Sequence, residues 1–107
     1  VLIVGSGNVV HNLRAMQRSA ADNQAYDWTV QFDTEVQQRF DSGNLADLST
    51  FLDWGPQARL AHPTHDHYLP LLYAAGAVQE GEVPRVFNDS YQCAALSMRS
   101  AIWGLNT

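Results

Sequence analysis

The sequence is a short, mildly acidic chain of 107 residues, with 46% hydrophobic residues, 16% charged residues and a formal net charge of −5. This length allows one domain at most, and the apolar fraction suffices for a hydrophobic core. The six basic residues are scattered along the chain and form no cationic cluster, so we expect no nucleic-acid partner. No apolar stretch is long enough for a signal sequence or a membrane span, so we expect no membrane partner. The single cysteine, Cys93, permits no internal disulfide and favours a cytoplasmic location.

The chain begins with a continuous apolar run, Val-Leu-Ile-Val at residues 1–4. A run without alternation is typical of a strand that is buried on both faces in a parallel sheet, and such a strand needs neighbours on both sides. No strand precedes it, and the chain lacks an initiator Met. We therefore expect residues 1–107 to be the C-terminal portion of a larger single domain. The expected fold class is α/β, with a partly parallel mixed sheet flanked by helices.

A glycine turn, Gly-Ser-Gly-Asn at residues 5–8, follows this run and predicts entry into a helix over residues 9–14 with Asn8 as the N-cap. The turn is not a nucleotide loop, because a dinucleotide fingerprint needs a third glycine where Val10 stands and a P-loop needs Gly-Lys-Ser/Thr. His11 would then lie just past the carboxyl end of a parallel strand, where open α/β sheets place catalytic groups. It is a candidate catalytic residue, although a lone histidine in an apolar setting is more often structural.

An amphipathic helix is predicted from Asp27 to Gly43, which fits the C′ position. Its apolar residues repeat every four positions and indicate a core stripe rather than a cofactor site: Trp28, Phe32, Val36 and Phe40. The charged residues of this helix are expected on its solvated face: Asp33, Glu35 and Arg39.

A second, short helix is predicted after Asn44, ending at Gly55-Pro56, and residues 57–61 are expected to be irregular. A further helix should begin near Asp66 and end at Gly76, with Pro70 either in its first turn or at a bend. Two strands are predicted beyond it. The first is short, at residues 85–87, and the second spans residues 94–103 with three apolar side chains facing one way: Leu96, Met98 and Ile102.

Three of the four histidines gather in the stretch His-Pro-Thr-His-Asp-His at residues 62–67. Histidine is both a metal ligand and a proton carrier near neutral pH, so this loop is where we expect chemistry. His65 and His67 would point to roughly opposite faces of a helix, so these three histidines alone are not expected to form a zinc site. One of them would instead join ligands from elsewhere. The simpler alternative is a solvated polar loop that caps a helix.

Two stretches together resemble the C-terminal half of the DOPA-type class III extradiol ring-cleaving dioxygenases. They are Gly-Ser-Gly-Asn-Val-Val-His-Asn-Leu-Arg at residues 5–14, and His-Pro-Thr followed by His-Tyr-Leu-Pro-Leu-Leu-Tyr within residues 62–73. The resemblance covers nearly the whole chain. It implies that His11 is the acid/base residue and His67 a metal ligand, and that two further metal-binding histidines belong to the N-terminal half of the domain.

His62 and His65 are candidates for residues that do not bind the metal themselves but contact and orient the ligand His67. Family members commonly carry Pro-Glu or a similar pair where this chain has His65-Asp66, which leaves a spare imidazole beside the ligand.

The resemblance also implies a reaction. A divalent metal with open positions chelates a catechol such as DOPA, and a nearby base takes a phenolic proton and later returns one. The implied cofactor is Fe²⁺, which suits dioxygen chemistry, or Zn²⁺, which three imidazoles also suit. The implied partners are a catechol-type substrate and O₂, and the oligomeric state is left open. Two alternatives remain: a non-catalytic α/β fragment that holds zinc, and a zinc-dependent hydrolase with Asp66 as the only local carboxylate base.

Overall fold

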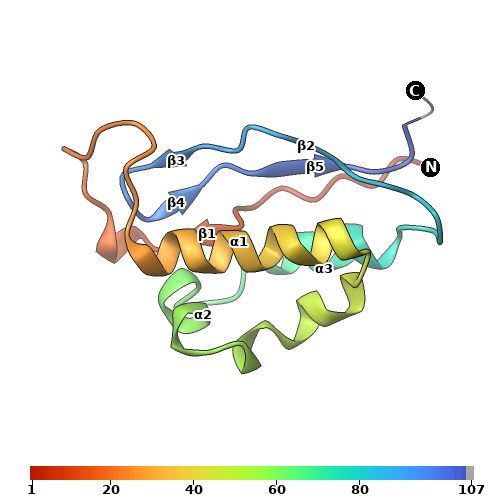
Figure 1. Ribbon diagram of the computed structural model, residues 1–107, viewed down its shortest axis with the longest axis horizontal. Helices are drawn as coiled ribbons and strands as arrows, with labels where there is room; N and C mark the ends of the chain where they lie inside the picture. Colours follow the sequence, from red (N-terminus) through yellow and green to blue (C-terminus); the bar gives the residue numbers. More distant parts are fainter. Residues whose placement is uncertain (106–107) are drawn as a thin grey trace.

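The computed structural model describes residues 1–105, in which most of the short strands lie along one side of the long helix α1 and the helices η2 and α2 along the other (Figure 1). This mixture of helices and small sheets confirms the α/β class. None of the helices in the described part is long and apolar enough to cross a membrane. The elements in chain order are β1 (Val10–His11), the 3₁₀-helix η1 (Leu13–Ala15), α1 (Asp27–Ser42), the 3₁₀-helix η2 (Leu45–Asp53), α2 (Pro56–Ala61), α3 (Leu69–Gly76), β2 (Arg85–Phe87), β3 (Tyr91–Gln92), β4 (Leu96–Ser97) and β5 (Ser100–Ile102).

Both sheets are antiparallel. One has the strand order β1-β4-β3, and the other pairs β2 with β5. Within residues 1–105, parallel pairing is confined to an isolated bridge between Ala25 and Ala94, so the predicted partly parallel sheet is not seen. The chain reverses between β3 and β4 at Cys93 and Ala94, whose φ angles are 52° and 63°.

The single strand predicted over residues 94–103 is wrong, because β4 and β5 belong to different sheets. The two strands separate at Met98, whose amide donates to the carbonyl of Ser90, and at Arg99, whose side chain reaches Asp33.

Residues 1–4 do not form the predicted buried strand. Their side chains are exposed, Leu2 to 83%, and no strand of the described residues pairs with them. A continuous apolar run encodes burial on both faces only where other strands supply both neighbours, and here no such neighbour is present.

The helix predicted over residues 9–14 is also wrong. Val9 and Val10 are buried and lead into β1, whose residues Val10 and His11 pair with Ser97 and Leu96 of β4. β-Branched residues favour the extended backbone, and sheet pairing here outweighs the cap signal of Asn8. The cap that does form is one turn later, where the side chain of Asn12 accepts a hydrogen bond of 3.1 Å from the amide of Ala15.

Helix α1 confirms the sequence prediction in its extent and in its buried stripe, and Gly43 at its C-terminus adopts a left-handed φ of 74°. Phe32 packs with ring-centroid distances of 6.3 Å to Phe51 and 5.7 Å to Tyr68. The core of the molecule therefore lies between α1 and the segments η2, α2 and the start of α3.

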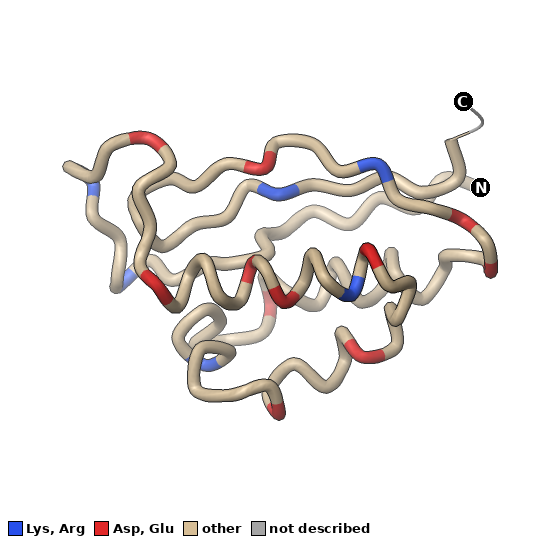
Figure 2. Tube along the Cα trace, in the orientation of Figure 1, with Lys and Arg blue, Asp and Glu red and all other residues tan. Residues whose placement is uncertain are grey.

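Asp33 corrects the expectation of a solvated charged face, because it is only 1% exposed. The basic residues are spread over the chain (Figure 2), and one of them, Arg99, donates to both carboxylate oxygens of Asp33 at 3.0 and 2.9 Å. Ser97 and Tyr91 donate to the same carboxylate at 2.5 and 2.8 Å. This network ties α1 to the strands, and burial together with Asp33 raises the pKa of Tyr91 to about 12.

The segment predicted as irregular at residues 57–61 is helical, because it belongs to α2, which starts with Pro56. Proline suits this position because its missing N–H would have no helical acceptor there. Helix α3 confirms the predicted end at Gly76 and has Pro70 in its first turn, but it begins at Leu69 rather than near Asp66. Its start is held by the carbonyl of His65, which accepts from the amides of Tyr68 and Leu69 at 3.0 and 2.9 Å.

Candidate functional site

The imidazole rings of His11 and His67 stack on each other. Their centroids are 3.5 Å apart and their planes differ by 10°. His11 comes from β1 and His67 from the loop before α3, and both side chains are half-buried. The structure therefore brings together the two histidines to which the sequence assigned roles, although His11 lies within an antiparallel strand rather than past the end of a parallel one.

The surroundings of His11 disfavour a positive charge on its ring. Burial, followed by the neighbouring His67, lowers the pKa of His11 below its ordinary value. His11 is therefore held as a neutral imidazole near pH 7, and a neutral imidazole can accept a proton.

Asp66 lies beside the pair, with Oδ2 at 3.3 Å from Nδ1 of His67. The other carboxylate oxygen accepts a hydrogen bond of 2.5 Å from the hydroxyl of Thr64, and this bond is the main cause of the lowered pKa of Asp66. The carboxylate is thus ionised and oriented toward His67. A carboxylate beside a histidine ring can orient that ring.

The backbone of the glycine turn lies directly against the histidine loop. The amide of Asn8 donates to the carbonyl of His67 at 2.9 Å. A Cβ at Gly7 would lie 2.2 Å from that carbonyl oxygen, and a Cβ at Gly5 would lie 2.5 Å from the carbonyl oxygen of Pro70. The two glycines are needed for this close approach, a role that the Gly-Ser-Gly-Asn string signalled only as a turn.

Two asparagines flank β1 and attach it to its surroundings. Asn8 donates from its side chain to the carbonyl of Ser97 at 3.3 Å, and Asn12 donates to the carbonyl of Leu60 at 2.7 Å. These contacts place His11 relative to β4 and α2. The sequence marked Asn8 only as a helix cap and gave no signal for either contact, because both partners are backbone groups that are distant in the chain.

His62 is the most enclosed of the four histidines. It is 1% exposed, its ring lies 5.0 Å from that of Tyr68, and its Nε2 is 2.6 Å from the carbonyl oxygen of Val9. Burial lowers its pKa to about 4, so the ring is neutral at physiological pH.

His65 is exposed, and its ring packs edge-on against Phe51 at a centroid distance of 5.4 Å. The structure thus separates the three clustered histidines. His67 faces His11, His62 lies in the core, and His65 lies on the far side of the loop.

His67 is a candidate for a single ligand position of a metal site, because its side chain is accessible and a carboxylate, Asp66, lies beside it. Within residues 1–105 no group of three or more His, Cys, Asp or Glu side chains could hold a metal ion.

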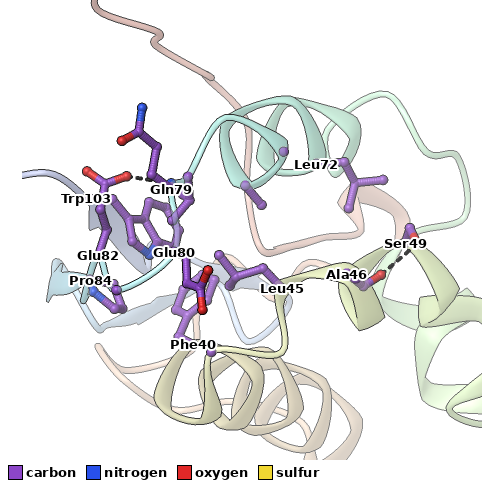
Figure 3. A pocket seen from close by; sticks show the side chains of 15 residues that line it. Phe40, Leu45, Ala46, Ser49, Leu72, Gln79, Glu80, Glu82, Pro84 and Trp103 are labelled. Atoms are coloured by element: carbon purple, nitrogen blue, oxygen red, sulfur yellow. Dashed lines mark hydrogen bonds between the residues drawn. The ribbon is translucent and has the colours of Figure 1, made fainter.

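A groove of about 660 Å³ runs beside His67, and its walls include Asn8, Arg99, residues 1–4 and the strand β5. This space adjoins His67 and is lined by both polar and apolar side chains, but His11 is not among its lining residues. A second cavity of about 540 Å³ lies between Phe40, Leu45, Leu72 and Trp103, with Glu80 and Glu82 at its rim (Figure 3). None of the histidines lines this second cavity, so it is not the candidate site.

Comparison with known proteins identifies relatives for nearly the whole chain. The 4,5-DOPA dioxygenase extradiol of Escherichia coli K12 is 34% identical over 103 residues, which are 94% of this chain and 37% of that protein. The 4,5-DOPA dioxygenase extradiol of Mirabilis jalapa is 29% identical over 85% of this chain and 33% of its own length. The chain thus spans about a third of the length of these relatives.

A solved structure supports the same relationship. The crystal structure of an uncharacterized protein from Escherichia coli K12 matches with a TM-score of 0.73 and 33% identity, over 90% of this chain and 40% of that one. Residues 1–101 match the family described as the catalytic LigB subunit of aromatic ring-opening dioxygenase. The stacked histidines, the fold and these matches agree, and the chain belongs to the LigB family of aromatic ring-opening dioxygenases.

Proposed function

We propose that this chain is the C-terminal portion of the catalytic domain of an extradiol dioxygenase that opens the ring of a catechol with O₂. In this proposal residues 1–107 provide His11 as the acid/base residue and His67 as one metal ligand. The observation that carries the proposal is the stacking of these two rings at a centroid distance of 3.5 Å, because it brings a proton carrier next to a ligand position.

The proton transfer follows from the state of His11. A neutral ring at this position can take the proton from a catechol hydroxyl that lies against it, and can later return a proton to an oxygen of the opened ring. Asp66 acts through His67, since a carboxylate at 3.3 Å keeps that ring in one orientation. His62 and His65 stay outside the reacting region and support the loop.

A bound divalent metal, Fe²⁺ or Zn²⁺, would hold both catechol oxygens and, in the case of iron, would supply the chemistry with dioxygen. His67 would be its ligand from this chain. The proposed substrate class is supported by the relatives, which are named 4,5-DOPA dioxygenase extradiol. The groove beside His67 includes apolar side chains that are compatible with an aromatic ring. A cytoplasmic location remains a prediction from the sequence.

The test uses the intact protein loaded separately with Fe²⁺ and with Zn²⁺. We expect consumption of O₂ and appearance of a ring-opened semialdehyde with DOPA or another catechol, and no product with a phenol that has a single hydroxyl. A protein that is folded and loaded with Fe²⁺ but consumes no O₂ with any catechol would contradict the proposal.

One observation favours a second candidate. The described residues hold no complete ligand set, which is also expected of a non-catalytic α/β unit that binds zinc through solvated histidines. The same assay separates the two, because that unit would bind Zn²⁺ and leave catechols unchanged. A zinc-dependent hydrolase with Asp66 as its base is the weakest alternative, because Asp66 is engaged by Thr64 and His67.

A further inference from the structure

His62 makes a contact that reaches from the histidine loop to the strand of His11. Its Nε2 lies 2.6 Å from the carbonyl oxygen of Val9, two residues before His11. The only hydrogen-bonding role open to a carbonyl oxygen is that of acceptor, so Nε2 carries the proton and donates it. Nδ1 is buried and has no partner, which agrees with a neutral ring protonated at Nε2.

The surroundings of His62 leave its ring little freedom. Phe32 and Phe51 meet it edge-on at centroid distances of 5.5 and 6.3 Å, and Tyr68 lies at 5.0 Å. Rings that are packed in this way occupy one rotamer. The donor at Nε2 is therefore a fixed point in the core, and the carbonyl of Val9 is attached to it.

The strand of His11 is held from two sides. On one side β1 pairs with β4, and on the other the donor of His62 holds Val9 while the amide of Asn8 donates to the carbonyl of His67 at 2.9 Å. Both contacts on the second side come from the histidine loop. The spacing between the His11 and His67 rings thus depends on the two hydrogen bonds that join this loop to residues 8 and 9.

We propose that His62 is a positioning residue for the catalytic pair, because its Nε2–H bond to Val9 fixes the strand that carries His11 against the loop that carries His67. This inference rests on the proposed function of that pair. His62 is buried and does not line the groove beside His67, so its effect would reach the reaction through the placement of His11.

The test compares two amides at position 62 in the intact, metal-loaded protein. The donor nitrogen of glutamine can reach the place of Nε2, whereas that of asparagine falls short of it. We expect His62→Asn to lower kcat by about tenfold to hundredfold, as misplacement by about 1 Å does, with little change in KM or metal content. His62→Gln should restore most of the lost turnover.

Tyr68→Phe is the matched control, because it also removes a buried hydrogen bond between a side chain and a backbone carbonyl in the same aromatic cluster. The hydroxyl of Tyr68 donates to Leu48 of η2 at 2.8 Å and not to the strand of His11. We expect Tyr68→Phe to lower thermal stability while kcat stays near the wild-type value. An equal loss of kcat in His62→Gln, or in Tyr68→Phe, would show that packing alone is involved and would overturn the inference.

If His62→Asn does not fold, a measurement on the unmodified protein tests the hydrogen bond between His62 and Val9. Nitrogen-15 NMR of labelled histidine should show a ring protonated at Nε2 with a coupling across the hydrogen bond to Val9, and a ring protonated at Nδ1 would overturn the inference. Failure of the proposed function is distinguishable. In that case the unmodified, metal-loaded protein would consume no O₂ with any catechol. Failure of this inference alone would leave the unmodified protein and His62→Asn equally active, with His11→Ala and His67→Ala inactive.

Discussion

The backbone amide of Asn8 donates a 2.9 Å hydrogen bond to the carbonyl of His67, and this bond joins the glycine turn to the histidine loop. These two segments approach so closely that a Cβ on Gly7 would lie 2.2 Å from the same carbonyl oxygen. A backbone oxygen cannot move aside as a flexible side chain can. The distance between the strand of His11 and the ligand candidate His67 is thus limited by a residue without a side chain.

Gly7→Ala should separate the two segments. We expect it to lower the free energy of unfolding by about 1–3 kcal/mol, as other overpacked sites do, and to reduce turnover of the intact protein. The control is Gly76→Ala at the end of α3, where an added Cβ meets no atom within 4 Å. That change should leave stability equal or raise it by up to about 1 kcal/mol, because alanine is the better helix residue. Denaturant unfolding of both variants is the measurement, and equal stability of the two would contradict the close approach.

His67→Ala and His11→Ala should separate ligand from base in the intact protein. The first should lower metal content, because it removes a ligand. The second should keep the metal and lower turnover by about a hundredfold to ten-thousandfold, the usual cost of losing a general base. Metal analysis beside turnover of each variant is the measurement.

If His11→Ala loses its metal as completely as His67→Ala, both histidines are ligands. The site would then have four protein ligands and a closed, structural character.

His62 should make the protein sensitive to acid. Its pKa is lowered from 6.5 to about 4 by burial, so the folded state holds the neutral ring while the unfolded chain takes up a proton. The stability contributed by the neutral ring is complete above pH 6.5 and is lost as the pH falls toward 4. The loss amounts to about 3 kcal/mol.

The measurement for His62 is the free energy of unfolding at several values between pH 7 and pH 4. His62→Gln has no titrating group at this position and should show a shallower decline over the same range. Because His11 also has a lowered pKa, part of the decline should remain in the variant. A decline of the same size in both proteins would exclude His62 as a cause.

Asp33→Asn should be far more damaging than Asp47→Asn. Asp33 is buried and its carboxylate accepts bonds from Arg99, Ser97 and Tyr91, so the substitution leaves the guanidinium without its counter-charge at a cost of about 3–5 kcal/mol. Asp47 also pairs with an arginine, Arg39, at 2.9 Å, but its side chain is 34% exposed and water can replace the lost bond. Thermal unfolding of the two variants gives the comparison.

Residues 1–107 alone should bind metal weakly and leave catechols intact. One ligand imidazole cannot supply the set of ligands that holds a metal and still leaves room for a substrate and oxygen. Isothermal titration with Zn²⁺ and an oxygen electrode are the measurements. Ring cleavage by this segment would show that the ligand count is wrong.

The sequence by itself determined the elements whose signals are local. The four-residue repeat of Phe32, Val36 and Phe40 specifies α1 because burial of one helix face depends only on spacing along the chain, and Gly43 and Pro70 mark ends through their own backbone preferences. The two motifs with His11 and His67 were also visible in the sequence.

Tertiary structure decided everything that depends on a distant partner. Asp33 is a charged residue outside the apolar stripe of α1, so its position in the sequence predicts exposure. It is buried because Arg99, between β4 and β5, donates to its carboxylate. His62, His65 and His67 belong to the same short stretch of sequence, yet one lies in the core, one on the surface and one against His11, since only packing determines which neighbours each ring meets. Residues 1–4 carry a strand pattern and stay exposed, because a strand is stabilised by partners that a local pattern does not contain.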